Sequence, residues 1–447
     1  MSEAAVEAVA AARDQFIPVR KADLLDALVE HGLLATDAER MQFRQICGML
    51  AAIYHYEYFD RLERLRQDYF YFDPELDPHA RFDDKALEAA YADLAASLTA
   101  VLKGANFVEM SHAEIEEAHR QRRAMRVKVA TSLEDFREIR FFHRGHHRET
   151  VEIRTSFGLR KESHEAIVYD DVVLFVATKP AAEIASRQER KLLARRKIRP
   201  GCVLIKYFRN IFSTDLNALF PNVRVVMTTF DTLALGVPAL AGAIPILLNL
   251  ASTVTVLFLV IGFYLGMVAS VAHDELRGAF AAMSGLAALI GFAMRQWLRY
   301  QRQSLKYQKE LTDNIYFRNV NNNAGIFDYI IGAAEDQECK EAFLAYYFLR
   351  TAQTALKKAE LERRIESWLK GTFAMDVKFD VEDALGKLSR LALLPRDGER
   401  FAVPPPDETV ARLQRVWSNF FQQRACAATA DKEATARGAA AAATVNP

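Results

Sequence analysis

Residues 233–272 read LALGVPALAGAIPILLNLASTVTVLFLVIGFYLGMVASVA, forty residues without one charged side chain. A helix rises about 1.5 Å per residue and a bilayer core is about 30 Å thick, so roughly twenty residues span it. After the short segment 273–277, a second uncharged run covers residues 278–294. The two runs predict a membrane segment over residues 233–297 with a soluble region on each side.

The first run contains Gly236, Pro238, Gly242 and Pro245, which interrupt a continuous helix. We therefore expect an interfacial segment and two spans, which place both soluble regions on the same side of the membrane. The expected ranges are 235–250 for the interfacial segment, about 251–272 for the first span and about 278–297 for the second. Whether the interfacial segment spans, re-enters or lies at the surface is left open.

Five basic residues follow the second span at spacings of four, three, four and three, which puts them on one helix face. These residues are Arg295, Arg299, Arg302, Lys306 and Lys309. The positive-inside rule then places both termini in the cytoplasm, and the lack of an N-terminal signal segment suggests a bacterial inner membrane. This stripe either contacts anionic headgroups, at about 1 kcal/mol per residue, or only fixes the topology.

Small residues recur every four positions within the spans, at Gly262, Gly266 and Ser270 and again at Ala281 and Gly285. Such spacing lets helix backbones approach closely, so we expect these residues to pack the two spans together or to pair protomers in a homo-oligomer. The uncharged runs 233–272 and 278–294 contain no charged side chain, and this absence argues against a pump or transporter.

Outside the membrane segment the hydrophobic period changes along the chain. It is helical over residues 16–122, extended over 123–232 and helical again over 298–424. The middle range predicts an α+β domain on an antiparallel or mixed sheet of about five strands, and the last range ends in a winged-helix-like order. Residues 1–15 and the Ala-rich residues 425–447 are expected to be disordered. The expected fold class is an α+β multi-domain membrane protein with a two-helix transmembrane hairpin.

Composition excludes some classes of protein. The chain has 58 Lys and Arg residues against 58 Asp and Glu residues, whereas a nucleic-acid binder usually has a basic excess. The four cysteines are far apart and form no CxxC pair, which indicates isolated thiols in a reducing compartment.

Candidate chemical groups are few. His143, His146 and His147 form the only histidine cluster and could bind a metal, but Arg144 and Arg148 would repel a cation. A polar turn is the favoured interpretation, and we expect no metal or cofactor. The chain has no phosphate-binding glycine loop, no GxSxG, no HExxH and no kinase motif set. A basic cluster over residues 187–206 and an acid-rich stretch over residues 334–341 are interpreted as exposed helix faces.

Several blocks along the chain carry a family resemblance. They include Phe16-Ile17-Pro18, Arg144-Gly145, Tyr169 to Leu174, Ile205 to Ile211, Tyr316 to Asn319, Asn323-Ala324-Gly325 and Lys340-Glu341. Over about residues 15–420 the chain resembles the transmembrane protein 143-like family, a domain of unknown function. Phe212 departs from the family pattern, which tends to have Pro at this position. The resemblance implies a two-span membrane protein and brings no catalytic residues.

The positions of this chain that match the family pattern are Arg144, Gly145, Lys206, Asn210, Asp215, Pro221, Asn322, Asn323, Gly325, Glu335, Lys340 and Glu341. Three functional hypotheses follow. The first is a membrane-anchored adaptor or regulatory protein, with cytoplasmic domains that bind anionic headgroups and an unknown protein partner. The second is an oligomeric channel or transporter subunit. The third is a membrane-bound enzyme acting on a lipid or phosphate group, which convergence of Arg144, His147, Arg209 and Asp215 in one cleft would favour.

Overall fold

The computed structural model describes most of the chain outside the predicted membrane segment. The described residues are 14–76, 84–111, 113–115, 128–130, 136–155, 160–184, 190, 199–220, 224–226, 258, 261–262, 265–266, 284, 287–288, 290–302, 305–306, 309, 315–394 and 399–419.

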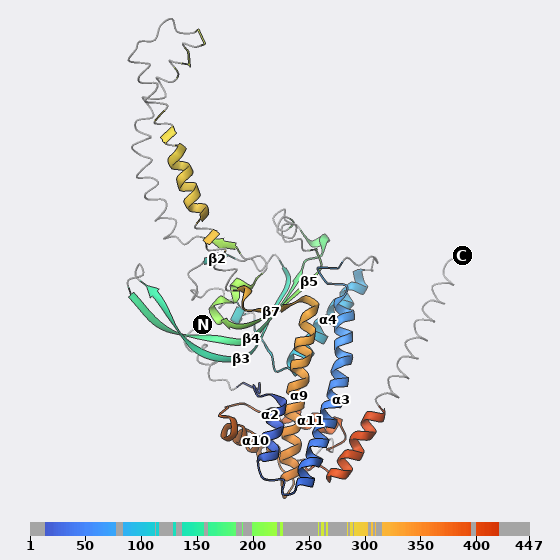
Figure 1. Cartoon of the computed structure of the whole chain (residues 1–447). Helices are drawn as coiled ribbons and strands as arrows, with labels where there is room; N and C mark the ends of the chain where they lie inside the picture. The colour runs from blue at the N-terminus through green and yellow to red at the C-terminus, as the bar shows by residue number, and fades with distance from the viewer. Residues whose placement is uncertain are drawn as a thin grey trace, which may run out of the picture.

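Two long helices form the axis of a helical bundle. These are α3 (Asp37–Tyr69) and α9 (Ile326–Thr351), which run side by side in Figure 1. The other helices are α2 (Lys21–Glu30), α4 (Asp84–Gly104), α10 (Lys358–Phe373), α11 (Val381–Arg390) and a last helix over residues 406–419. A capping box starts α3, because the Thr36 hydroxyl accepts from the Glu39 N–H at 3.2 Å and the Glu39 carboxylate accepts from the Thr36 N–H at 3.1 Å.

The open five-stranded sheet is antiparallel throughout and has the order β1-β3-β4-β5-β7. Its strands are β1 (Val108–Glu109), β3 (Phe136–Thr155), β4 (Arg160–Thr178), β5 (Val203–Phe212) and β7 (Asn319–Asn322). A separate two-stranded sheet pairs β2 (Lys128–Ala130) with β6 (Arg224–Val226). The prediction of an antiparallel or mixed sheet of about five strands is confirmed.

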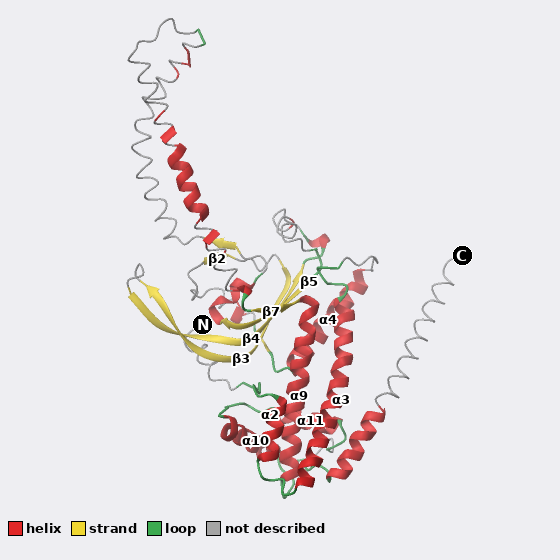
Figure 2. Cartoon of the chain, in the orientation of Figure 1, coloured by secondary structure: helices red, strands yellow, loops and turns green. Residues whose placement is uncertain are grey.

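The hairpin of β3 and β4 is longer than its neighbours. Strand β5 pairs with β4 only over residues 168–177, so the outer part of the hairpin continues as a two-stranded arm, which Figure 2 shows projecting from the body. The inner part is covered on both faces. Val173 and Phe175 belong to the core shared with the helices, whereas Val172 and Leu174 belong to a second core. This alternation follows from the period of two along a strand, and it makes the sheet a central layer.

The second core is closed by η4 (Ser213–Leu219), a short 3₁₀ helix that supplies Leu216 and Leu219. Two further short 3₁₀ helices are η3 (Ala181–Glu183) and η5 (Asn323–Gly325). At the C-terminal end, α10, α11 and the helix over residues 406–419 follow one another, and the single β-bridge there joins Phe401 to Leu356 ahead of α10. The predicted turn at residues 395–398 lies outside the described residues, as do residues 1–13 and the predicted tail over 425–447.

The prediction of a two-span, multi-pass protein of the inner membrane is wrong. No helix among the described residues has both the length and the apolar character that a membrane crossing requires. Within the first predicted span, Gly266 lies in a turn at φ +74°, a left-handed conformation that commonly ends a helix. At the second predicted span, 278–297, the described residues 284, 287–288 and 290–297 are helical, and Arg295 lies within this range. The interfacial range 235–250 lies outside the described residues.

Candidate functional site

Buried charged and polar side chains gather where the sheet meets the helices, a region that we call the junction. Its members are Asn106, Arg144, Asp171, Tyr207, Gln337, Glu338, Lys340, Glu341 and Lys387. Most of these side chains are under a tenth exposed, although residues of these types usually lie at the surface. The junction is therefore the natural candidate for a functional site.

The first half of the junction is an ion pair between neighbouring strands. Arg144 of β3 lies opposite Asp171 of β4, and its Nη2 and Nε donate to Asp171 Oδ2 at 2.5 and 3.1 Å. The other carboxylate oxygen, Oδ1, accepts from the Tyr207 hydroxyl at 2.6 Å and from Arg209 Nε at 3.2 Å. Burial, and then the charge of Asp171, raises the pKa of Tyr207 to about 12. Protein donors thus occupy both carboxylate oxygens of Asp171.

Gly145 allows this pairing to form. It adopts φ +66°, and a Cβ added there would lie 2.3 Å from Asp170 Oδ2. The register of the ladder is unchanged across Gly145, since Arg144 pairs with Asp171 and His146 pairs with Tyr169. On one side of Gly145 the Arg144 side chain reaches the buried Asp171, and on the other side His147 reaches the more exposed Asp170 at 2.6 Å.

The second half of the junction surrounds Lys387 of α11. Its Nζ contacts the carboxylates of Glu341, of Asp383 at 2.7 Å and of Glu338 at 3.2 Å. Burial opposes the charge on Lys387, but the three carboxylates outweigh it and hold its pKa above the ordinary value. Burial also raises the pKa of Glu341, although Lys387 and Asn106, which donates to Glu341 Oε1 at 2.9 Å, stabilise its charged form. A single ammonium group thus compensates the two buried carboxylates.

The three histidines lie within β3, so the interpretation of residues 143–148 as a polar turn is wrong. The ring of His143 contacts that of Tyr169 at 4.6 Å, whereas His146 lies 3.9 Å from Asp14 and His147 bonds to Asp170. In the part of the chain that the structure describes, no three His, Cys, Asp or Glu side chains are arranged to hold a metal ion.

We expect His143 to make stability depend on pH. Burial lowers the pKa of His143 from its ordinary value of 6.5, and Asp14 and Glu114 oppose the shift. Between the folded pKa and 6.5 the unfolded chain binds the additional proton, so stability is lost as the pH falls through this window, by up to about 1.4 kcal/mol per pH unit. Denaturant unfolding of His143→Phe, which retains a ring against Tyr169, should show a correspondingly weaker pH dependence. The same slope in both proteins would contradict this assignment.

The four residues that would favour an enzyme do not meet in one cleft. Arg144 and Arg209 share the carboxylate of Asp171, whereas His147 bonds to the neighbouring Asp170. Asp215 is buried in η4, beside the second core. This arrangement adds no support to the enzyme hypothesis.

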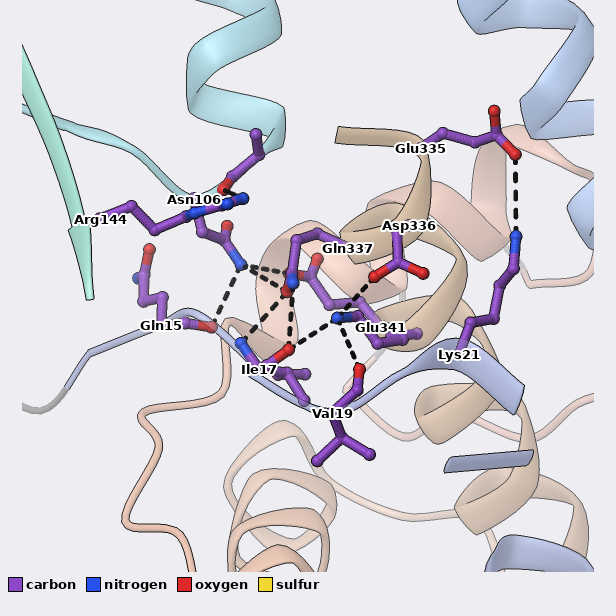
Figure 3. Close-up of polar contacts among 12 residues, drawn as sticks. Gln15, Ile17, Val19, Lys21, Asn106, Arg144, Glu335, Asp336, Gln337 and Glu341 are labelled. Atoms are coloured by element: carbon purple, nitrogen blue, oxygen red, sulfur yellow. Dashed lines mark hydrogen bonds and ion pairs between the residues drawn. The ribbon is translucent and has the colours of Figure 1, made fainter. Parts of the chain in front are cut away.

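Three of the family-pattern positions, Arg144, Lys340 and Glu341, belong to the junction. Glu335 is nearby on α9 and pairs with Lys21 at 3.7 Å (Figure 3) and with His55 at 2.9 Å. The others shape the sheet and its turns. Lys206 lies opposite Asn322 in the β5–β7 ladder, and Asn210 adopts a left-handed backbone conformation with φ +53°. The side-chain oxygen of Asn323 accepts from the Ile205 N–H at 3.4 Å. Gly325 packs against the side chain of Asn321. Pro221 lies outside the described residues.

The predicted membrane-associated residues are only partly described. Arg295, Arg299 and Arg302 lie exposed on the helix over residues 290–302, and Lys306 and Lys309 are also helical and exposed. Gly262 is helical and Gly266 lies in the turn noted above, whereas Ser270, Ala281 and Gly285 lie outside the described residues. Most of the basic cluster over residues 187–206 also lies outside the described residues.

Sequence reasoning missed half of the junction. The interpretation of residues 334–341 as an exposed helix face is wrong, because Gln337, Lys340 and Glu341 are at most 3% exposed. The sequence of α11 contained a signal that Lys387 is buried. Lys387 lies between Leu385 and Leu388, on the side of the helix that faces the core, and it follows Asp383 by four residues, which allows an ion pair.

The fold and the junction define a mixed helix and sheet protein in which an open antiparallel sheet is joined to a helical bundle by paired buried charges. A family model described as "Protein of unknown function (DUF3754)" matches residues 169–325. The matched range begins within β4 and ends with η5, so it contains Asp171 and Tyr207 but neither Arg144 nor Lys340. No solved structure matches the chain. The comparisons do not show a transmembrane protein 143-like family.

Proposed function

We propose that this protein is an adaptor or regulatory protein that docks on anionic lipid surfaces through the helix over residues 290–302. The observation that carries the proposal is the exposure of this helix. None of its residues is buried, and Figure 1 shows it extending away from the body. An exposed helix with a continuous apolar face indicates a surface that another molecule covers.

The apolar face is well defined. At about 100° per residue, four large apolar side chains of this helix fall within an arc of about 100°. They are Ile290, Met294, Trp297 and Leu298, each at least 43% exposed. Tyr300, which is 51% exposed, lies beside this arc. Trp and Tyr are enriched where a bilayer meets water, because their rings are partly apolar and partly polar.

The basic face adjoins the apolar face. With the same spacing per residue, Arg295, Arg299 and Arg302 of this helix fall within about 60°. The sequence contains no Asp or Glu between Gly278 and Lys309, so no acid within one turn of these three arginines neutralises them. Adjoining cationic and apolar faces with interfacial aromatics are typical of helices that lie flat on anionic membranes. This charge pattern favours a lipid surface over an acidic or apolar protein partner.

We expect the purified chain to co-sediment with vesicles that contain an anionic phospholipid and to bind neutral phosphatidylcholine vesicles much more weakly. Replacing Arg295, Arg299 and Arg302 with Gln should weaken binding to the anionic vesicles by about 100-fold, because each contact contributes about 1 kcal/mol. High salt should also weaken the binding of the wild-type chain to the anionic vesicles, because it screens the arginine charges.

A matched control comes from α10. Its exposed basic residues Arg363, Arg364 and Lys370 can be replaced with Gln, which removes the same net charge from another helix. This control should retain most of the binding. Equal binding to neutral and anionic vesicles, or an equal loss in both triple variants, would contradict docking through residues 290–302.

If the protein is an adaptor, the junction serves to stabilise the fold. In this proposal the junction holds the sheet on the bundle while exposed surfaces bind partners, among them an unidentified protein. Membership of the transmembrane protein 143-like family also stays a proposal, supported by the sequence blocks that resemble it.

A further inference from the structure

The N-terminal residues 14–19, which we call the strap, have no regular secondary structure and yet are bound along their length. Ile17, in the middle of the strap, is fully buried. The strap crosses the junction between α9, the end of α4 and β3, and Figure 3 shows Asn106 and Gln337 directed at it. Its binding resembles that of a peptide in a groove more than that of a packed loop.

Side chains of the groove bind the main chain of the strap. Gln337 accepts from the Ile17 N–H at 3.2 Å and donates to the Ile17 carbonyl at 3.1 Å, as a neighbouring strand would. Lys340 Nζ donates to the carbonyls of Ile17 at 2.6 Å and Val19 at 3.0 Å, and Asn106 donates to the Gln15 carbonyl at 3.1 Å. Main-chain recognition by fixed polar groups is a general means of binding an extended segment.

Two side chains of the strap add selectivity. The guanidinium of Arg144 lies between two rings, 4.2 Å from the centroid of Phe16 and 4.6 Å from that of Phe107. Lys340 Nζ lies 5.7 Å from the same Phe16 ring. These cation–ring contacts favour an aromatic residue at the position of Phe16. The fully buried position of Ile17 favours an aliphatic residue.

The groove would be costly to leave empty. Lys340 and Gln337 are 2% and 1% exposed, and the strap carbonyls complete their hydrogen bonding. Loss of the strap would exchange these hydrogen bonds for bonds to water and expose the apolar surface that buries Ile17, so the groove favours replacement by a segment of the same chemistry.

We propose that this groove is a recognition site for an extended protein segment with an aromatic residue followed by an aliphatic residue, and that the strap occupies it in cis as an autoinhibitory contact. The partner is a protein that presents such a segment in an extended conformation. A tethered strap acts at an effective concentration on the order of millimolar, so it keeps weak competitors out. The proposal is independent of lipid binding, since it uses none of the residues of the helix over residues 290–302.

The test uses the full chain and a fluorescent synthetic peptide of residues 14–20, followed by anisotropy. The wild-type chain should bind the peptide weakly because its own strap competes. A chain with Phe16→Ala and Ile17→Ala keeps the groove but weakens the strap, so it should bind at least about tenfold more tightly. The peptide should also raise the midpoint of thermal unfolding of this variant, because it binds the folded state.

Three controls make the result specific. A peptide carrying the same two Ala replacements should not bind, and adding Lys340→Met to the strap variant should abolish the gain. Phe16→Ala alone is a milder strap variant in case the double replacement impairs folding. The proposal is overturned if a folded strap variant binds the peptide no more tightly than the wild-type chain, or binds both peptides alike.

Discussion

Replacing Asp171 with Ala is expected to destabilise the folded protein by about 3–5 kcal/mol, because it leaves the buried Arg144 without its carboxylate. The Tyr207 hydroxyl loses its acceptor in the same step. The free energy of unfolding can be measured by urea denaturation with circular dichroism. The midpoint should shift to much lower urea, or the variant should fail to accumulate as folded protein.

The adjacent residue supplies the control. Asp170→Ala removes a carboxylate that bonds to the half-exposed His147, so it should cost no more than about 1 kcal/mol. A second variant, Arg144→Met with Asp171→Leu, removes both charges and should be more stable than Asp171→Ala alone. Equal stability of the Asp170 and Asp171 variants would show that burial does not make this pair important.

Replacing Lys387 with Met is expected to cost a similar amount, about 3–5 kcal/mol near neutral pH, because Glu341 and Glu338 then stay buried with no cation between them. The pKa of Glu341 is already raised by burial, and loss of Lys387 raises it further. A carboxyl with a raised folded pKa is stabilising below its unfolded pKa, and that stability is lost as the pH rises through the folded pKa. The deficit of the variant should therefore shrink as the pH is lowered toward about 5.

Lys378→Met is the matched control, since this lysine is exposed and only its main-chain N–H contacts the strap. It should change stability by no more than about 0.5 kcal/mol at any pH. If Lys387→Met unfolds at the wild-type urea concentration, or if its deficit does not change with pH, the buried charge pairing described for the junction is incorrect.

Much of the sheet was predictable because its signal is local. Val172 to Val176 on β4 alternate between two cores. The runs rich in Val, Ile and Phe that follow one another with short turns predicted an antiparallel or mixed sheet, and the structure shows the antiparallel one. The expectation that residues 143–148 form a turn failed because polar side chains can lie within a long strand. The residues from His143 to His147 lie opposite residues 172–168 of β4, within the part of the sheet that β5 also joins, and ion pairs such as Arg144 with Asp171 accommodate the polar side chains there.

The membrane prediction failed at particular residues. It rested on the length of an uncharged run. A run of sufficient length is necessary for a membrane-spanning helix, but its length does not show that the helix is continuous. Gly266 was interpreted as a close-packing residue in a span, whereas it lies in a turn with a positive φ. The basic stripe from Arg295 to Lys309 was expected to lie on one helix face, and its first three residues, Arg295, Arg299 and Arg302, lie on the described helix over residues 290–302. Its role in lipid binding stays a prediction.

The sequence by itself determined the order of helical and extended segments and limited the sheet to an antiparallel or mixed one, because side-chain period and turn residues act over a few positions. Only the tertiary structure decided that residues 334–341 are buried and that the junction exists. Arg144 and Asp171 are 27 residues apart, Glu341 and Lys387 are 46 apart, and Gln337 lies 320 residues from the strap residue that it binds. A charged side chain becomes stable inside a protein only when its distant partner arrives, and that pairing is a property of the fold.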